Sequence, residues 1–136
     1  MKKELIFVEG NCTGCRLCEL MCVLEKEGAC GLSRARLKLI ESDTLETYDK
    51  KICRQCDEPD CQAACPEKAI IRNSSTGALI VDQELCTGCQ LCVDACPYEA
   101  IFWDTDREVV LKCDLCDGKV FCVTACPKQA LLFEPI

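Results

Sequence analysis

Histidine is absent from this chain of 136 residues, and aromatic residues make up only 5% of it. Without histidine, the commonest general acid or base of enzymes is missing, and no glycine-rich dinucleotide fingerprint appears. The scarcity of aromatic side chains also leaves little apolar material for a conventional core at this length. These absences argue against a catalytic protein and indicate that something else helps to hold the fold together.

Long apolar runs and an excess of basic residues are also missing. No segment approaches the roughly 20 apolar residues that cross a bilayer. The apolar run within the N-terminal MKKELIFVEGNC is too short for a signal peptide. We therefore expect a cytoplasmic protein without direct membrane insertion. The formal net charge of −7 argues against nucleic acid as a partner, because binding to phosphates requires a basic patch.

Cysteine, by contrast, is abundant, with 17 residues in the chain. Sixteen of them fall into four motifs of similar spacing, and Cys30 stands alone as an expected small buried residue. The motifs are, in order, Cys12, Cys15, Cys18, Cys22; Cys53, Cys56, Cys61, Cys65; Cys86, Cys89, Cys92, Cys96; and Cys113, Cys116, Cys122, Cys126. In a reducing compartment, cysteines this dense indicate metal ligands rather than disulfides.

The repeat extends beyond cysteine, because three motifs close on a similar phrase: CPEKAII, CPYEAIF and CPKQALL. Each phrase predicts a short apolar strand after its proline, and further strands are predicted over residues 5–8, 78–81 and 109–111. The three residues between the third and fourth cysteine of each motif suit one helical turn. Residues 73–77 predict a turn between two strands.

Residues 23–52 form the longest gap between motifs and carry many charges. This segment is interpreted either as a surface excursion that contacts a partner or as a plain solvated connector.

The third motif, CTGCQLCVDACP, matches the C-x2-C-x2-C-x3-C-P run that binds [4Fe–4S] clusters, and the first matches all but the proline. The second and fourth have longer loops before their third cysteine. Zinc also takes four thiolates, but it usually draws two pairs from separate knuckles. We therefore predict [4Fe–4S] clusters, and sixteen thiolates suffice for four of them with no open iron.

Some residues inside the motifs are candidates for tuning the clusters. Gly14 and Gly88 either let backbone N–H groups turn toward a cluster or merely permit a tight turn. Arg16 and Arg54 are expected to raise the reduction potential of their clusters. Asp114 and Asp117 are expected to lower that of the fourth loop, whereas arginines that simply face water would have little effect.

With these motifs, the whole chain resembles the four-cluster polyferredoxin subunits that accompany molybdenum or tungsten pterin enzymes and hydrogenases. The resemblance implies an α+β fold of two pseudo-twofold-related bacterial-ferredoxin-like halves of the βαββαβ type, with long loops. Residues 1–136 would form one four-cluster unit, with residues 1–30 and 104–136 in one half and 50–103 in the other. Val23 stands where a proline is usual after the fourth cysteine of a motif.

The resemblance also implies how the cysteines are shared, which spacing alone does not give. One half would hold a cluster on Cys12, Cys15, Cys18 and Cys126 and its neighbour on Cys113, Cys116, Cys122 and Cys22. The other half would use Cys53, Cys56, Cys61 and Cys96 for one cluster and Cys86, Cys89, Cys92 and Cys65 for the last.

The function implied is electron transfer between a catalytic oxidoreductase subunit and a second carrier of the flavin or ferredoxin type. The chain looks most like the small subunit of a tungsten-containing aldehyde oxidoreductase, with formate dehydrogenase or hydrogenase as other partners of the family. Two alternatives stay open: a free-standing polyferredoxin that shuttles electrons between separate enzymes, and a regulatory cluster protein, for which no DNA-binding segment is seen.

Overall fold

The computed structural model describes residues 3–28, 31–41 and 48–135, and it is built from short helices and strands. In chain order, the elements are β1 (Lys3–Phe7), η1 (Glu9–Asn11), α1 (Leu17–Glu27), η2 (Leu32–Arg34), β2 (Lys38–Glu41), β3 (Tyr48–Lys51), α2 (Asp60–Ala64), β4 (Ile70–Arg72), β5 (Leu79–Val81), α3 (Leu91–Ala95), β6 (Ile101–Asp104), β7 (Val109–Lys112), η3 (Leu115–Gly118), α4 (Phe121–Ala125) and β8 (Leu131–Pro135). This composition confirms the α+β class.

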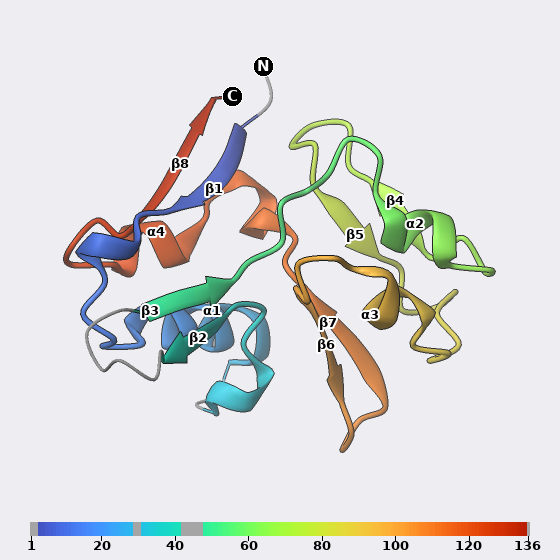
Figure 1. The fold of residues 1–136 in the computed structure, drawn as a ribbon. Coiled ribbons are helices and arrows are strands. Elements are labelled where there is room, and N and C mark those ends of the chain that lie inside the picture. Colours follow the sequence, from blue (N-terminus) through green and yellow to red (C-terminus); the bar gives the residue numbers. More distant parts are fainter. Residues whose placement is uncertain (1–2, 29–30, 42–47, 136) are drawn as a thin grey trace.

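The described strands pair as four antiparallel two-stranded sheets, β1 with β8, β2 with β3, β4 with β5, and β6 with β7. The strands expected after the three C-P phrases are confirmed as β4, β6 and β8, and the other three as β1, β5 and β7. The predicted turn between β4 and β5 is also confirmed, since the N–H of Gly77 donates to the carbonyl of Asn73 over 2.8 Å. Because β1 pairs with β8, the two ends of the chain lie side by side (Figure 1).

Each cysteine motif places its third cysteine in the first turn of a helix, as the three-residue spacing predicts. Helix α1 packs on α4, and α2 packs on α3. The three short helices end at the fourth cysteine of their motif, whereas α1 continues past Cys22 to Glu27. The helices thus bring motif one beside motif four and motif two beside motif three.

Two groups of buried residues follow this division. Leu5 and Leu131, from the two ends of the chain, share one group with Leu115. Ile70, Leu79 and Ile101, together with others from the middle of the chain, form the second. In Figure 1, β1, β8, α1 and α4 accordingly lie apart from the α2/α3 pair with β4 to β7. Their description as pseudo-twofold halves with the boundaries given above stays a prediction.

The segment between motifs one and two is more than a surface excursion. Ala35, Leu37 and Leu39 alternate as buried residues, and the last of them lies in β2, which pairs with β3. The buried carboxylate of Glu19 in α1 accepts a hydrogen bond from the N–H of Leu39, which fixes β2 on the helix. The alternation was visible in the sequence as a strand period of two. Cys30 lies outside the described residues.

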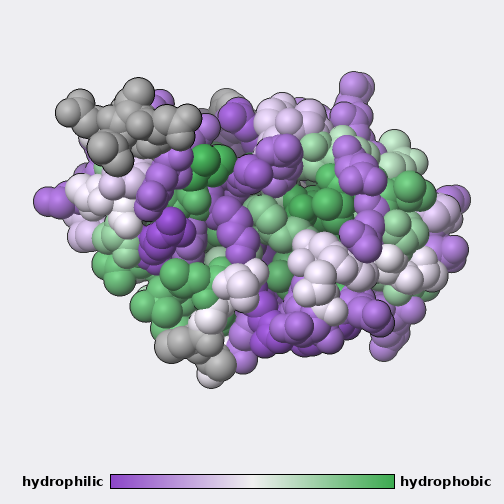
Figure 2. Space-filling model, turned by 60° about the horizontal axis from the view of Figure 1, so that its bottom comes forward, coloured by the Kyte–Doolittle hydropathy of each residue, from purple (hydrophilic) through white to green (hydrophobic). Residues whose placement is uncertain are grey.

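The molecular surface mixes polar and apolar side chains. On the face seen in Figure 2, polar residues alternate with separate apolar patches. In the part of the chain that the structure describes, none of the helices has the length and apolar character needed to span a bilayer.

Candidate cluster-binding sites

Three hollows in the molecule are each lined by four motif cysteines. Each set combines the first three cysteines of one motif with the last cysteine of the motif packed beside it. The Cys12 hollow has Cys12, Cys15, Cys18 and Cys126; the Cys22 hollow has Cys22, Cys113, Cys116 and Cys122; and the Cys65 hollow has Cys65, Cys86, Cys89 and Cys92. These are three of the four sets that the resemblance implies, and their role as ligands stays a prediction.

The remaining four cysteines form what we call the Cys53 group: Cys53, Cys56, Cys61 and Cys96. Cys61 lies in the second buried group and Cys96 packs against that group. Burial raises the pKa of the Cys61 thiol, with smaller contributions from Cys53 and Cys96. Cys56 follows in the same loop, and its backbone carbonyl accepts a hydrogen bond from the guanidinium of Arg72.

The groups also lie next to one another in a fixed order. The pKa of Cys122 in the Cys22 hollow is raised to about 12 by burial and by neighbouring sulfurs that include Cys18 of the Cys12 hollow. Burial raises the pKa of Cys113 as well, and Cys53 contributes to the rise. The pKa of Cys92 rises to about 11, mainly through burial, with Cys61 among the contributors. The order is therefore Cys12 hollow, Cys22 hollow, Cys53 group and Cys65 hollow.

The fourth cysteine of motifs two, three and four receives a backbone hydrogen bond from the alanine four residues later. The N to Sγ distances are 3.3 Å from Ala69 to Cys65, 3.4 Å from Ala100 to Cys96 and 3.3 Å from Ala130 to Cys126. All three alanines are buried. An N–H donated to sulfur stabilises negative charge on a thiolate, and it would do the same for a ligand of an anionic cluster.

Motif one achieves this contact in another way. Val23 replaces the proline, so α1 continues through Cys22 and cannot form the local turn. Instead, the N–H of Arg36 donates to Cys22 Sγ over 3.2 Å from 14 residues along the chain. The segment between motifs one and two therefore supplies a hydrogen bond that the other motifs make within themselves.

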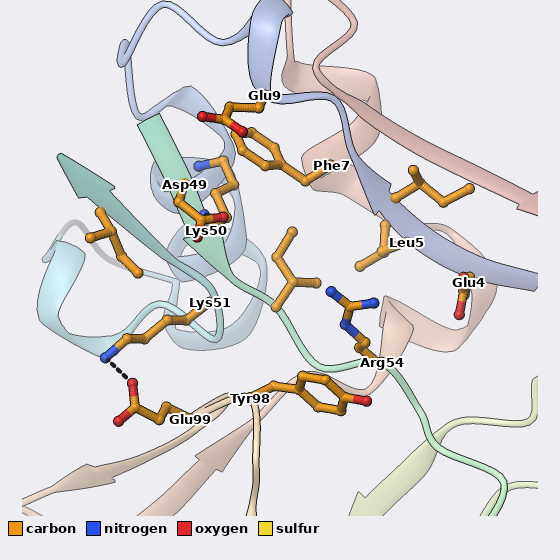
Figure 3. A pocket seen from close by; sticks show the side chains of 13 residues that line it. Glu4, Leu5, Phe7, Glu9, Asp49, Lys50, Lys51, Arg54, Tyr98 and Glu99 are labelled. Carbon is orange, nitrogen blue, oxygen red and sulfur yellow. Dashed lines mark hydrogen bonds and ion pairs between the residues drawn. The ribbon is translucent and has the colours of Figure 1, made fainter. Parts of the chain in front are cut away.

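Lys50 is a contributor to the site that sequence reasoning missed. Its ammonium lies 2.9 Å from Cys18 Sγ, and its side chain lines both the Cys12 hollow and a groove of about 480 Å³ between β1 and β3. Figure 3 shows Lys50 beside Phe7 in this groove, with the nitrogen 5.8 Å from the ring centre. No local pattern indicates the contact, because 32 residues separate the lysine from the cysteine.

Gly14 and Gly88 both have positive φ angles, of 75° and 76°, which favour glycine. Each also lies under an aromatic ring: a Cβ on Gly14 would come 2.6 Å from Tyr48 Cζ, and one on Gly88 would come 3.2 Å from Trp103 Cη2. The turn and the packed ring thus both require glycine at these positions. The rings cover the loops between the first two cysteines of motifs one and three.

The two arginines expected to raise cluster potentials have other contacts. Arg16 forms ion pairs with Glu19 at 3.3 Å and Glu41 at 3.5 Å. Arg54 is exposed and lies over the ring of Tyr98, 4.7 Å from its centre (Figure 3). These contacts and the nearby water reduce the field that either arginine exerts on a sulfur.

Asp114 is likewise balanced. Its carboxylate is 2.5 Å from the ammonium of Lys26 and accepts the N–H of Cys116 at 2.9 Å. The pKa of Asp114 is lowered despite its burial, because these two partners outweigh desolvation. Asp117 is exposed to solvent. The effect of these two arginines and two aspartates on cluster potentials stays a prediction. Its physical basis is weak, because a neighbouring charge or solvent offsets the field of each side chain.

The donor set fits an iron–sulfur cluster. Each hollow brings four soft cysteine sulfurs to one place, and backbone N–H groups point at cysteine sulfurs. Within residues 3–28, 31–41 and 48–135, no three cysteine, aspartate or glutamate side chains gather tightly enough to hold a single metal ion.

Comparison with known proteins agrees with this chemistry. Residues 45–135 match the family described as "4Fe-4S dicluster domain". The chain is 35% identical over 110 residues to the polyferredoxin-like subunit of aliphatic sulfonate oxidoreductase from Pyrococcus furiosus, covering 81% of this chain and 63% of that one. It is 33% identical over 103 residues to a tetrathionate reductase subunit from Archaeoglobus fulgidus, covering 76% and 49%.

The chain spans between 25% and 63% of the length of the curated relatives it matches. Among solved structures, a chain of the active site complex BamBC of benzoyl coenzyme A reductase aligns with a TM-score of 0.56 at 22% identity, covering 97% of this chain and 76% of that one. At this identity, the likeness concerns the fold alone.

Proposed function

Because the chain belongs to the 4Fe–4S dicluster domain family, we propose that it is a non-catalytic electron-transfer subunit that relays single electrons through four [4Fe–4S] clusters. The observation that carries this proposal is the sharing of cysteines, since three hollows each combine three sulfurs of one motif with one of another. When bound, such a cluster accepts and releases one electron while its cysteine ligands stay in place.

The four ligand sets we propose are the three hollows and the Cys53 group. The order of these groups along the molecule supports a linear relay. Cys15 in the first hollow and Cys89 in the last are the two exposed cysteines among the sixteen. We infer that electrons enter and leave near these two sulfurs, where a partner can approach a cluster most closely.

The chain's own residues hold the sulfurs and stabilise their charge. The short helices fix the third and fourth cysteines of each motif, and backbone N–H groups donate to the fourth sulfur. Metal binding requires deprotonated thiols, and burial raises the pKa of several of them, so cluster binding and folding depend on each other.

The partner we propose is a catalytic oxidoreductase subunit, with a second redox carrier at the other end of the relay. Two relatives support this, because their names describe subunits of an aliphatic sulfonate oxidoreductase and a tetrathionate reductase. A tungsten-type aldehyde oxidoreductase is the class we prefer, on the resemblance of the motifs.

Anaerobic purification from the source organism tests both parts of the proposal. We expect about 16 iron and 16 sulfide per chain, and paramagnetic [4Fe–4S] signals after reduction. Native mass measurement should show a larger co-purifying subunit. A colourless, zinc-loaded protein would overturn the cluster assignment, and an iron-loaded monomer without a partner would instead favour a free-standing shuttle.

A further inference from the structure

Lys112 is a buried cation whose hydrogen-bond partners in the described part of the chain are all uncharged. Only 7% of the residue is exposed, and its ammonium donates to three neutral oxygens: the carbonyl of Leu79 at 2.7 Å, the carbonyl of Cys113 at 3.1 Å and Oε1 of Gln55 at 3.2 Å. Within the described ranges, no carboxylate forms an ion pair with it. A buried ammonium without a counter-charge is costly, and a nearby negative charge would offset that cost.

Gln55 holds this lysine at the meeting point of motifs two and four. The side chain is 1% exposed, and its Nε2 donates to the carbonyl of Cys113 over 2.9 Å. Its Oε1 accepts from the N–H of Leu79 at 2.8 Å as well as from Lys112. The backbone N–H of Gln55 lies 3.5 Å from Cys53 Sγ. One residue therefore touches Cys53 of the Cys53 group and Cys113 of the Cys22 hollow.

Cysteines of both inner groups lie beside this pair, because the ammonium contacts the carbonyl of Cys113 and the N–H of Gln55 lies next to Cys53 Sγ. Burial is the main influence on the Cys61 and Cys113 thiols and raises the pKa of both, while the positive charge of Lys112 opposes the rise in each. Cys61 belongs to the Cys53 group and Cys113 to the Cys22 hollow. The lysine thus acts electrostatically on both of the inner groups of the proposed relay.

We propose that Lys112, positioned by Gln55, is the shared counter-cation of the two inner clusters and makes both of them easier to reduce. This rests on the proposed function, which places a cluster of charge about −2 in each inner group. Little water reaches the lysine, so its charge is screened far less than that of a surface residue. An electron passing between the Cys53 group and the Cys22 hollow would then move between two clusters whose reduced forms are stabilised by the same cation.

Redox-monitored EPR of the anaerobic full-length holoprotein tests the inference. In Lys112→Met, we expect two of the four reduction steps to become harder by about tenfold in equilibrium constant, or about 59 mV for one electron. The other two steps should shift by less than about twofold, because they lie farther away. Lys51→Met is the matched control: it removes the same charge from a partly exposed residue paired with Glu99 and should move no inner step.

Two further variants keep the test decisive if Lys112→Met binds less iron. Gln55→Glu places a carboxylate on the ammonium without removing the lysine, and it should shift the same two steps in the same direction. Lys112→Arg should keep the full iron content. Unchanged potentials at full iron content, an equal shift of all four steps, or iron loss in all three variants would overturn the role of Lys112. Absence of [4Fe–4S] signals from the unmodified protein would instead refute the proposed function.

Discussion

The α1/α4 region and the α2/α3 region both support the sulfur of a fourth cysteine with a backbone N–H, but they do so over different distances in the sequence. In the α2/α3 region, Cys65 and Cys96 each receive the bond from an alanine four residues on. In the α1/α4 region, Cys126 follows that rule, whereas Cys22 depends on Arg36. The same chemical requirement is therefore met locally where proline ends the helix and by a distant segment where it does not.

The two outer hollows differ in charge as well. Among the described residues, the Cys12 hollow is lined by Lys50, by Lys128 and by Arg16, whose charge is balanced by ion pairs, and by no acidic side chain. The residues described around the Cys65 hollow include the carboxylate of Glu67 and no basic side chain. Positive charge favours the reduced form of a cluster, so the two ends of the proposed relay lie in unlike fields. The Cys12 end should hold the higher potential.

Removing the iron of the proposed clusters should produce the largest difference between the α1/α4 and α2/α3 regions. Among the described residues, the buried group of the α1/α4 region has ten members, three of them cysteines, and that of the α2/α3 region has six, two of them cysteines. With less core of its own, the α2/α3 region should lose amide protection first under anaerobic chelation, followed by the rest of the chain. Hydrogen exchange read by mass spectrometry measures this, and simultaneous loss everywhere would show one cooperative unit.

Replacing Val23 by the proline that the other three motifs have should be the next most destabilising change. Val23→Pro would break α1 four residues before its end and remove a buried side chain, at a cost of about 3 kcal/mol or more. The reverse exchange, Pro66→Val, lies just beyond the end of α2 and should cost less than about 1 kcal/mol. Anaerobic thermal unfolding of the holoproteins compares them. A stabilised Val23→Pro variant would contradict the role assigned to Arg36.

The two loop glycines offer a finer comparison. Gly14→Ala and Gly88→Ala should each cost about 1–2 kcal/mol, since both positions have positive φ angles. The cost should be greater at Gly14, because its new Cβ would meet Tyr48 at 2.6 Å, against 3.2 Å for Trp103 at Gly88. Melting temperatures of the two variants give the ranking, and equal losses would mean that the Tyr48 ring moves aside freely.

The smallest expected effect is a change in the reduction potential of the proposed cluster in the Cys12 hollow, near Lys50. Lys50→Met removes the ammonium from Cys18 Sγ and should disfavour reduction of that cluster by about threefold to tenfold, because the lysine is still partly exposed to screening water. Lys51→Met, one residue along β3, serves as the control. Redox titration followed by EPR detects the shift in reduction potential. Equal potentials in the two variants would contradict the expected effect of Lys50 at the Cys12 end.

Local patterns in the sequence predicted the repeating parts of the fold well. The phrases after Cys65, Cys96 and Cys126 predicted β4, β6 and β8, and the three-residue spacing predicted the helical turns. These features succeed because each is set by residues close in sequence: a proline, a helix of one or two turns, and a strand of β-rich residues. The cysteine motifs likewise identified the candidate ligands without any knowledge of the fold.

The features that the sequence did not predict depend on contacts between segments that are far apart in the chain. The hydrogen bond from Arg36 to Cys22, the approach of Lys50 to Cys18, and the burial of Lys112 against Gln55 each join residues from different elements. Lys112 gave no sign of its role, because a lysine at the end of a strand is usually exposed. The sharing of cysteines between motifs also required the helix packing, and the sequence alone suggested it only through resemblance.

The exposure of Cys15 and Cys89 has a consequence for handling in air. Dioxygen and peroxide attack accessible sulfur first, so oxidative damage should begin at the two extremities of the molecule and reach the interior last. Under the proposed function, a sample that has begun to decay would keep its inner clusters, and with them much of its colour and iron. It would nevertheless fail to transfer electrons between the proposed partners, so colour and iron content alone would overstate how much of such a sample is active.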